Sequence, residues 1–366
     1  MSEPIRAVPG TGDQRFATGN ERRGGGRRDD RRPGDQRGGG GRRRRGRAEE
    51  PMVPEAEFVS YYGRPVVKSP PWRAPIPIYL FAGGLAAGSS LLGAGADLTD
   101  RPALRRNTRI VATAGLSASL LALVVDLGHP ERFLNMLRVF KPTSPMSVGT
   151  WVLSAYAPGA LIAGAAEVAR LLPFDFGVLG RLLDWAARPA GIAAALIAPG
   201  VASYTAVLLS DTATPAWHDA HAELPFVFAG SAAGASGGLA MMLSPVRECG
   251  PARRLAAVGA AVELAAEHRM EQSMGLSAET LHSGKAGRLM KASKVLTAVG
   301  GAGAALLAGR SRTAAVVSGA ALVAGSVCTR FGVFEAGPAS VKDPKYTIVP
   351  QRERLERRRA ASADAK

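Results

Sequence analysis

Uncharged apolar runs long enough to cross a lipid bilayer constrain this chain more than any other feature. Four runs contain 22 to 25 residues without a charged side chain, at residues 74–96, 142–166, 189–210 and 224–246. A bilayer core needs about 20 predominantly apolar residues per spanning helix. The sequence therefore predicts a polytopic membrane domain between residues 73 and 330, and it excludes a soluble fold for that region.

Weaker apolar runs add further candidate spans. Three of them contain 15 to 17 uncharged residues, at residues 110–125, 295–309 and 313–329, and a fourth at 255–266 carries Glu263. Such short runs can still span if the flanking Arg and Lys side chains reach back to the membrane surface. Counting all of them predicts an all-α membrane protein with eight transmembrane helices. No stretch alternates with a period of two residues, which excludes a β-barrel.

The net charge of +16 and the mean hydropathy of +0.04 are averages over unlike segments. Residues 1–50 hold 14 Arg and 8 acidic residues, and residues 329–366 hold 9 basic and 5 acidic residues. We therefore predict a disordered Arg/Gly-rich tail over residues 1–56, a transmembrane domain over 57–330 and a basic C-terminal tail over 331–366. The positive charge of the tails is expected to attract anionic lipid headgroups. An RGG-type RNA contact is the alternative, but the charge pattern does not favour a nucleic-acid partner.

An internal repeat predicts how the helices are grouped. The segment Phe-Ala-Gly-Gly-Leu-Ala-Ala-Gly-Ser at residues 81–89 resembles Phe-Ala-Gly-Ser-Ala-Ala-Gly-Ala-Ser at residues 228–236. The two copies are four predicted helices apart, so both should cross the membrane in the same direction. This predicts two parallel four-helix bundles, with repeat halves at 74–210 and 224–329. Each copy contains a small-xxx-small pair, which permits close packing of helix backbones.

With eight spans, both tails and three loops share one membrane surface, called the tail side below. Asp126, His129, Tyr79 and Tyr204 all fall near it. A carboxyl group at the end of an apolar helix must be paired with a cation, protonated, or in contact with a water-filled cavity. Asp126 is therefore either a proton donor or acceptor for a ligand, or a helix-end acid that pairs with Arg132 or caps a neighbouring helix. The two tyrosines could donate hydrogen bonds to a ligand carbonyl or belong to an interfacial aromatic belt.

The remaining ionisable residues limit the redox chemistry open to this chain. Glu263 and Glu267, four residues apart, could line a proton path, or they could mark the wet face of an amphipathic helix end. Five His and two Cys are too few for a Cys-based metal or iron–sulfur site, and the histidines lie at helix ends or in loops, which argues against haem. We therefore expect no metal or haem in this chain, with electrons arriving from a partner and leaving on a diffusible carrier.

Several sequence blocks resemble segments of a known membrane-protein family. The most specific are Asp-Leu-Gly-His-Pro at residues 126–130 and Ser-Pro-Met-Ser-Val-Gly-Thr-Trp at residues 144–151. The block Pro-Ile-Tyr-Leu-Phe-Ala-Gly-Gly at residues 77–84 and shorter segments at 204–209 and 224–228 agree as well. In this order, over residues 57–350, the chain resembles the NrfD/polysulfide-reductase membrane-subunit family.

The resemblance implies eight helices in two four-helix bundles without haem. It also implies a site for menaquinone or another quinone at the face where a partner iron–sulfur subunit docks, usually with a molybdopterin catalytic subunit. Asp126 matches the acid that serves quinone protonation, and Tyr204 falls where a tyrosine contacts the headgroup. Tyr79 lies in the first-helix region that supplies polar contacts, although relatives use other residue types there. His129 is our own addition, as a second proton carrier beside Asp126.

These observations predict a quinone-interacting membrane anchor that is not catalytic alone. It would pass electrons between membrane quinone and the iron–sulfur subunit. Two alternatives stay open: a proton-coupled secondary transporter, and a purely structural anchor without a quinone site. We expect a multi-pass protein of the cell membrane. Loop charges are nearly balanced between the two surfaces and do not decide its orientation, but an Arg-rich tail without a recognisable export signal favours a cytoplasmic location for the tails.

Overall fold

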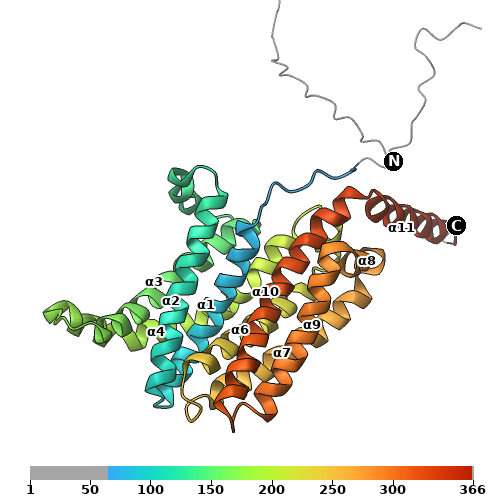
Figure 1. Ribbon diagram of the computed structural model, residues 1–366. Coiled ribbons are helices and arrows are strands. Elements are labelled where there is room, and N and C mark those ends of the chain that lie inside the picture. Colours follow the sequence, from blue (N-terminus) through green and yellow to red (C-terminus); the bar gives the residue numbers. More distant parts are fainter. Residues whose placement is uncertain (1–64, 365–366) are drawn as a thin grey trace, which may run out of the picture. The chain divides into compact units, whose positions relative to one another are not determined.

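The computed structural model describes residues 65–364, and within this range the chain forms helices joined by turns and loops, without strands (Figure 1). The predicted tail over residues 1–56 lies outside the described residues. Eight long helices form the body of the described region. They are α1 (Pro75–Leu98), α2 (Pro102–Asp126), α3 (Pro145–Leu171), α4 (Gly177–Ser210), α6 (Leu224–Leu243), α7 (Gly250–Ser273), α9 (Gly284–Leu306) and α10 (Arg312–Lys342).

Shorter elements connect these helices, and one charged helix follows them. At the tail side, the connections are η1 (Pro130–Arg138), α5 (Pro215–Asp219), η2 (Gly275–Ala278) and α8 (Glu279–His282), and α11 (Lys345–Asp364) follows α10. The long helices begin at sequence signals for helix starts. Proline occupies the first turn of α1, α2, α3, α6 and α7, where its missing N–H is not needed.

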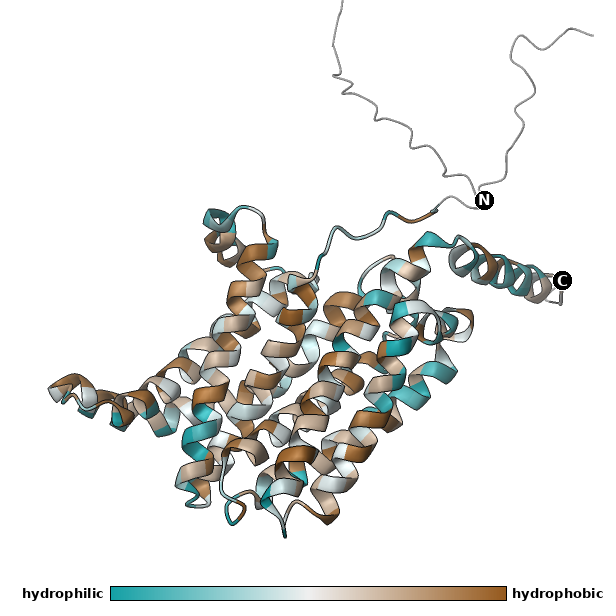
Figure 2. Cartoon of the chain, viewed as in Figure 1, coloured by the Kyte–Doolittle hydropathy of each residue, from teal (hydrophilic) through white to brown (hydrophobic). Residues whose placement is uncertain are grey.

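Six helices of the described region are long and apolar enough to cross a membrane: α1, α2, α3, α4, α6 and α10. The predicted all-helical chain with several spans is thereby confirmed. Helices α7 and α9 contain more charged residues, which include Glu263 and Glu267 on α7 and Lys291 and Lys294 on α9. Figure 2 shows apolar residues along the long helices, with hydrophilic residues concentrated near their ends and along α11.

Helix α1 lies at the centre of the helix packing, in contact with α2, α4 and α6. Its glycines make this possible, because a side chain at Gly84 would meet Ala232 and Arg330, and one at Gly88 would overlap Ser236. The contacts join residues of the segments 81–89 and 228–236, so the two copies of the internal repeat pack against each other. Close backbone approach at small residues is the usual basis of helix association in membranes.

The C-terminal part of the chain contains more helix than the apolar runs indicate. Helix α10 continues past Arg330 to Lys342. Arg330 is fully buried within the helix packing, so it does not mark a membrane edge. Helix α11 then occupies most of the predicted C-terminal tail. Lys345 at its start donates a 2.8 Å hydrogen bond to Glu279 of α8, and this bond holds the pKa of the exposed Glu279 carboxyl below its usual range.

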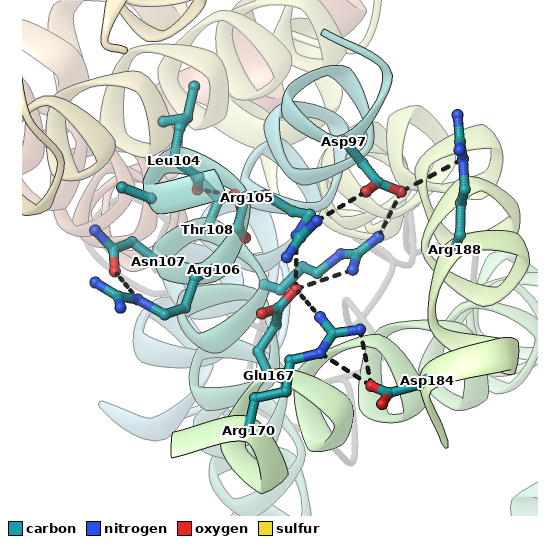
Figure 3. Close-up of polar contacts among 12 residues, drawn as sticks. Asp97, Leu104, Arg105, Arg106, Asn107, Thr108, Glu167, Arg170, Asp184 and Arg188 are labelled. Carbon is teal, nitrogen blue, oxygen red and sulfur yellow. Dashed lines mark hydrogen bonds and ion pairs between the residues drawn. The ribbon is translucent and has the colours of Figure 1, made fainter. Parts of the chain in front are cut away.

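An ion-pair network joins α1, α2, α3 and α4 at the end opposite the tail side (Figure 3). The buried Glu167 carboxylate accepts hydrogen bonds from Arg105 and Arg109 of α2, at 2.9 and 3.0 Å, and lies 3.0 Å from Arg170. Arg109, also buried, pairs with Asp97 of α1 at 3.0 Å. Mutual pairing offsets part of the cost of removing these charges from water.

We predict that Glu167→Ala lowers the thermal stability of the protein in detergent, because it leaves the buried Arg109 short of one counter-ion. Loss of one partner from a buried ion pair typically costs about 3–5 kcal/mol. Asp184→Ala is the matched control, since Asp184 pairs with Arg170 while 55% of its side chain is exposed. An equal fall in melting temperature for the two variants would contradict a special role for the buried pair.

Candidate functional site

A cavity of about 460 Å³ lies where α1, α2, α3 and α4 approach the tail side. Its volume falls within the range of roughly 300–1,000 Å³ that is usual for small-molecule sites. The walls are mainly apolar and include Ile76, Leu80, Leu120, Leu123, Leu153 and Leu208. Asp126, Tyr79 and Tyr204 line the same cavity. The structure therefore brings together these three residues that the sequence analysis placed near one surface.

Each of the three polar residues is positioned by a different helix. Tyr79, in the second turn of α1, is buried, and its backbone carbonyl accepts a 3.2 Å hydrogen bond from Ser119 of α2. Asp126 is the last residue of α2, and its carboxyl group faces the main chain and the charge of Arg73. Tyr204 lies two turns before the end of α4. Polar groups from three helices thus enter a mainly apolar space.

Gly149 of α3 explains the shape of the wall beside Tyr204. A β-carbon at Gly149 would overlap the Tyr204 ring. The glycine in the Ser-Pro-Met-Ser-Val-Gly-Thr-Trp block therefore makes room for the tyrosine rather than bending the helix. Gly200 of α4 differs, because its added β-carbon would meet Val152 at 3.5 Å, an ordinary van der Waals distance.

The segment after α2 covers the mouth of the cavity. Gly128 has a positive φ of 69°, a conformation that glycine adopts at little cost, and it turns the chain out of α2. Element η1 follows, and it contributes Phe133, Met136 and Leu137 to the cavity wall. None of the η1 residues is buried. The Asp-Leu-Gly-His-Pro block therefore ends one helix, makes the turn and begins the cover of the cavity.

His129 points away from this cavity. Its side chain is 63% exposed, and its Nδ1 atom lies 3.9 Å from the carboxylate of Glu131. It is not among the residues that line the cavity. The turn at Gly128 and the extended backbone before Pro130 separate it from Asp126, which precedes it by three residues in sequence.

Two tryptophans support the cavity on the side of α10. Trp217 of α5 is buried and donates a 2.7 Å hydrogen bond to the carbonyl of Val333. Its ring stacks on Trp72 with a centroid separation of 5.5 Å, and Trp72 lines the cavity. The sequence shows Trp217 in a short polar loop but contains no signal that this side chain is buried. The lining residues of η1 were also missed, because their role depends on the turn.

Glu263 and Glu267 lie elsewhere, in the interior between α7, α9 and α10. Neither residue lines the cavity. Glu263 accepts a 2.6 Å hydrogen bond from Thr329 of α10, and Glu267 lies 3.9 Å from Lys294 of α9. Both glutamates are buried. The two glutamates are thus separate from the cavity of α1–α4.

The described residues include no group of three or more His, Cys, Asp and Glu side chains placed to hold a metal ion. The two cysteines, Cys249 and Cys328, are both free. Apart from the three polar residues named above, the polar side chains in the cavity wall are Thr150 and Ser154, whose hydroxyls donate hydrogen bonds to carbonyls of their own helix, and the rest of the surface is mainly apolar. Its chemistry suits hydrogen bonding and proton exchange with an apolar ligand.

Comparison with known proteins identifies the family. The family model for polysulphide reductase, NrfD, matches residues 66–257, which include all the residues of the cavity. The chain belongs to the NrfD family. It is also 32% identical over 180 residues to the C subunit of polysulfide reductase from Wolinella succinogenes. This match covers 46% of the chain and 57% of that relative, so it spans little more than half of the relative's length.

Membership of the NrfD family agrees with the helical structure. Six apolar helices and the family match together make the chain a multi-pass membrane protein. The predicted family resemblance is confirmed, and the family match begins before α1 and ends within α7. The polar site between α7, α9 and α10 therefore lies largely beyond the matched residues.

Proposed function

We propose that this NrfD-family protein is the quinone-interacting membrane anchor of an oxidoreductase complex. The observation that carries the proposal is the apolar cavity at the tail side, with Asp126, Tyr79 and Tyr204 in its wall. A quinone is an apolar ring with two carbonyl groups and an apolar tail, so it needs this combination. The substrate would be menaquinone or another membrane quinone.

Reduction of a quinone to a quinol consumes two electrons and two protons. The Tyr204 and Tyr79 hydroxyls would donate hydrogen bonds to carbonyl oxygens and orient the ring. Asp126, at the edge of the cavity beside Arg73, would transfer protons to or from the ligand oxygen. His129, exposed to water three residues after Asp126, would be a second proton carrier at this end of α2. The reverse sequence serves quinol oxidation.

We assign no redox centre to this chain. The electrons would therefore come from or go to a partner. We propose an iron–sulfur subunit that docks at the tail side, together with a molybdopterin catalytic subunit. Two observations support this placement: the cavity opens among the tail-side helix ends, and the relative is named as one component of polysulfide reductase. Docking at this surface keeps the electron-transfer distance short. On this account, the chain alone is not catalytic.

We further propose that α7 and α9 also cross the membrane, which makes eight spans in two groups of four. Their lengths of 24 and 23 residues are sufficient for a bilayer core. The buried Glu263 and Glu267 do not oppose insertion, because they face the interior and not the outer surface. Lys291 and Lys294 lie in the half of α9 nearer the tail side, from which long side chains can reach the membrane surface. The packing of α1 on α6 through the repeated segments supports a repeat of four helices. The Arg-rich tails are assigned to the cytoplasm.

We predict that Asp126→Asn in the purified complex slows quinone turnover by about 100-fold or more, the usual effect of losing a general acid or base. Asparagine keeps the size of the side chain but cannot exchange the proton. Asp211→Asn is the control, because Asp211 is exposed at the end of α4 and does not line the cavity. Normal turnover in Asp126→Asn would contradict the assigned role.

We also predict that Gly149→Ala weakens quinone binding and raises the quinone KM, because the new methyl group must displace the Tyr204 ring. Gly200→Ala should leave the KM unchanged, since its methyl group finds ordinary contact distances on the same pair of helices. Quinone titrations of the two complexes under matched conditions measure this difference. Similar KM values for Gly149→Ala and the unsubstituted protein would show that the Tyr204 ring does not help to hold the headgroup.

A further inference from the structure

A row of acidic side chains leads from the tail side into the interior of α7, α9 and α10. Glu263, Glu267 and Glu271 are spaced four residues apart on α7, so they share one face of the helix. Glu263 and Glu267 are 2% and 0% exposed, and the Glu271 side chain is 15% exposed. The row thus passes from the partly exposed Glu271 at the tail side to the buried Glu267 and Glu263 further along the helix.

The innermost member, Glu263, has several partners. Its carboxylate accepts hydrogen bonds from Thr329 at 2.6 Å and Thr297 at 3.4 Å. The charge of the fully buried Arg330 faces it from α10. The Arg330 guanidinium also donates a 2.7 Å hydrogen bond to the carbonyl of Phe228 and lies over that ring. These contacts suit an ionised Glu263 carboxylate.

Glu267, one turn nearer the tail side, is different. It is fully buried, and neither of its carboxyl oxygens has a hydrogen-bond partner within the described residues. The Lys294 ammonium lies 3.9 Å away but donates its 2.7 Å hydrogen bond to Glu271. Burying an ionised carboxylate without hydrogen bonds is strongly unfavourable, and such a group takes up a proton instead.

Ionisable side chains from α7, α9 and α10 lie around Glu267. Its own helix presents Glu263 and Glu271, α9 presents Lys294, and α10 presents Arg330 beyond Glu263. Helix α6 carries no ionisable Asp, Glu, His, Lys or Arg residue. At the tail side, Glu271 lies 3.6 Å from the half-exposed His282. Between Gly250 and Val262, α7 contains no acidic residue. The row of glutamates therefore reaches the membrane surface only at the tail side.

We propose that Glu267 is a proton-binding site, filled from the tail side through His282, Glu271 and Lys294, which exchanges its proton with Glu263. In the transfer, the O–H bond of the Glu267 carboxyl breaks and one forms on Glu263, and no electron moves. A neutral Glu263 would leave Arg330 without its counter-charge next to Gly84 of α1. The site shares no residue with the quinone cavity and does not depend on its assignment.

Infrared spectroscopy of the full-length protein in lipid membranes tests the proposal through the C=O stretching band of protonated carboxyl groups. At neutral pH we expect one such band that shifts in D₂O, is lost in Glu267→Gln and is kept in Glu335→Gln. Glu335 is the control, because it is a partly exposed α10 residue paired with Lys285. An unchanged band in Glu267→Gln, or no such band in the unsubstituted protein, would overturn the proposal.

Three further variants separate a proton site from a packing role. Glu267→Asp retains an acid, so the band should change frequency and not disappear, which also decides the matter if Glu267→Gln fails to fold. Lys294→Met removes the nearest positive charge, so the band should persist to higher pH. Glu271→Gln should keep the band but slow its shift in D₂O at least several-fold. A band insensitive to all three substitutions would refute the assignment to Glu267.

Discussion

The cost of an unpaired charge inside a membrane governs the arrangement of this protein. The α1–α4 helices place Arg109 and Glu167 in mutual contact at the end opposite the tail side, where Arg109 also pairs with Asp97. This pairing leaves the middle of the same four helices apolar. The tail-side end can then hold a cavity whose ionisable wall residue, Asp126, sits at the last turn of a helix.

The cavity depends on a few glycines as much as on its polar groups. Gly149 admits the Tyr204 ring between α3 and α4, and Gly128 turns the chain from α2 into the η1 cover. Gly84 and Gly88 bring α1 against α6 and join the two repeated segments. The glycines in these sequence blocks therefore determine how closely the helices approach and where the chain turns. They set the positions from which Asp126 and the tyrosines can reach a ligand.

Much of the fold follows from the sequence, because long apolar runs leave a chain few alternatives to membrane helices. Helix direction predicted that Asp126, Tyr79 and Tyr204 lie at one membrane surface, and the family resemblance implied that they share one site. His129 was grouped with them by its place in the chain, but the turn at Gly128 directs it outward. Only the three-dimensional packing could show this difference.

Contacts between distant residues were the least predictable part. Glu167 pairs with Arg109 across 58 positions, and Thr329 reaches Glu263 across 66. Arg330 at the end of an apolar run indicates a membrane boundary by sequence, whereas the structure buries it on Phe228. No periodicity in the sequence indicates such pairs, because each pair depends on the relative orientation of two packed helices.

Photoaffinity labelling with an azido-quinone tests the central claim most directly. Irradiation of membranes that contain the protein should attach the label to cavity residues from α2, η1 and α4, such as Leu123, Phe133 and Leu208, and excess unlabelled quinone should suppress it. Labelling of lipid-facing residues alone, such as Leu196 with its 78% exposure, would contradict a quinone site in this cavity.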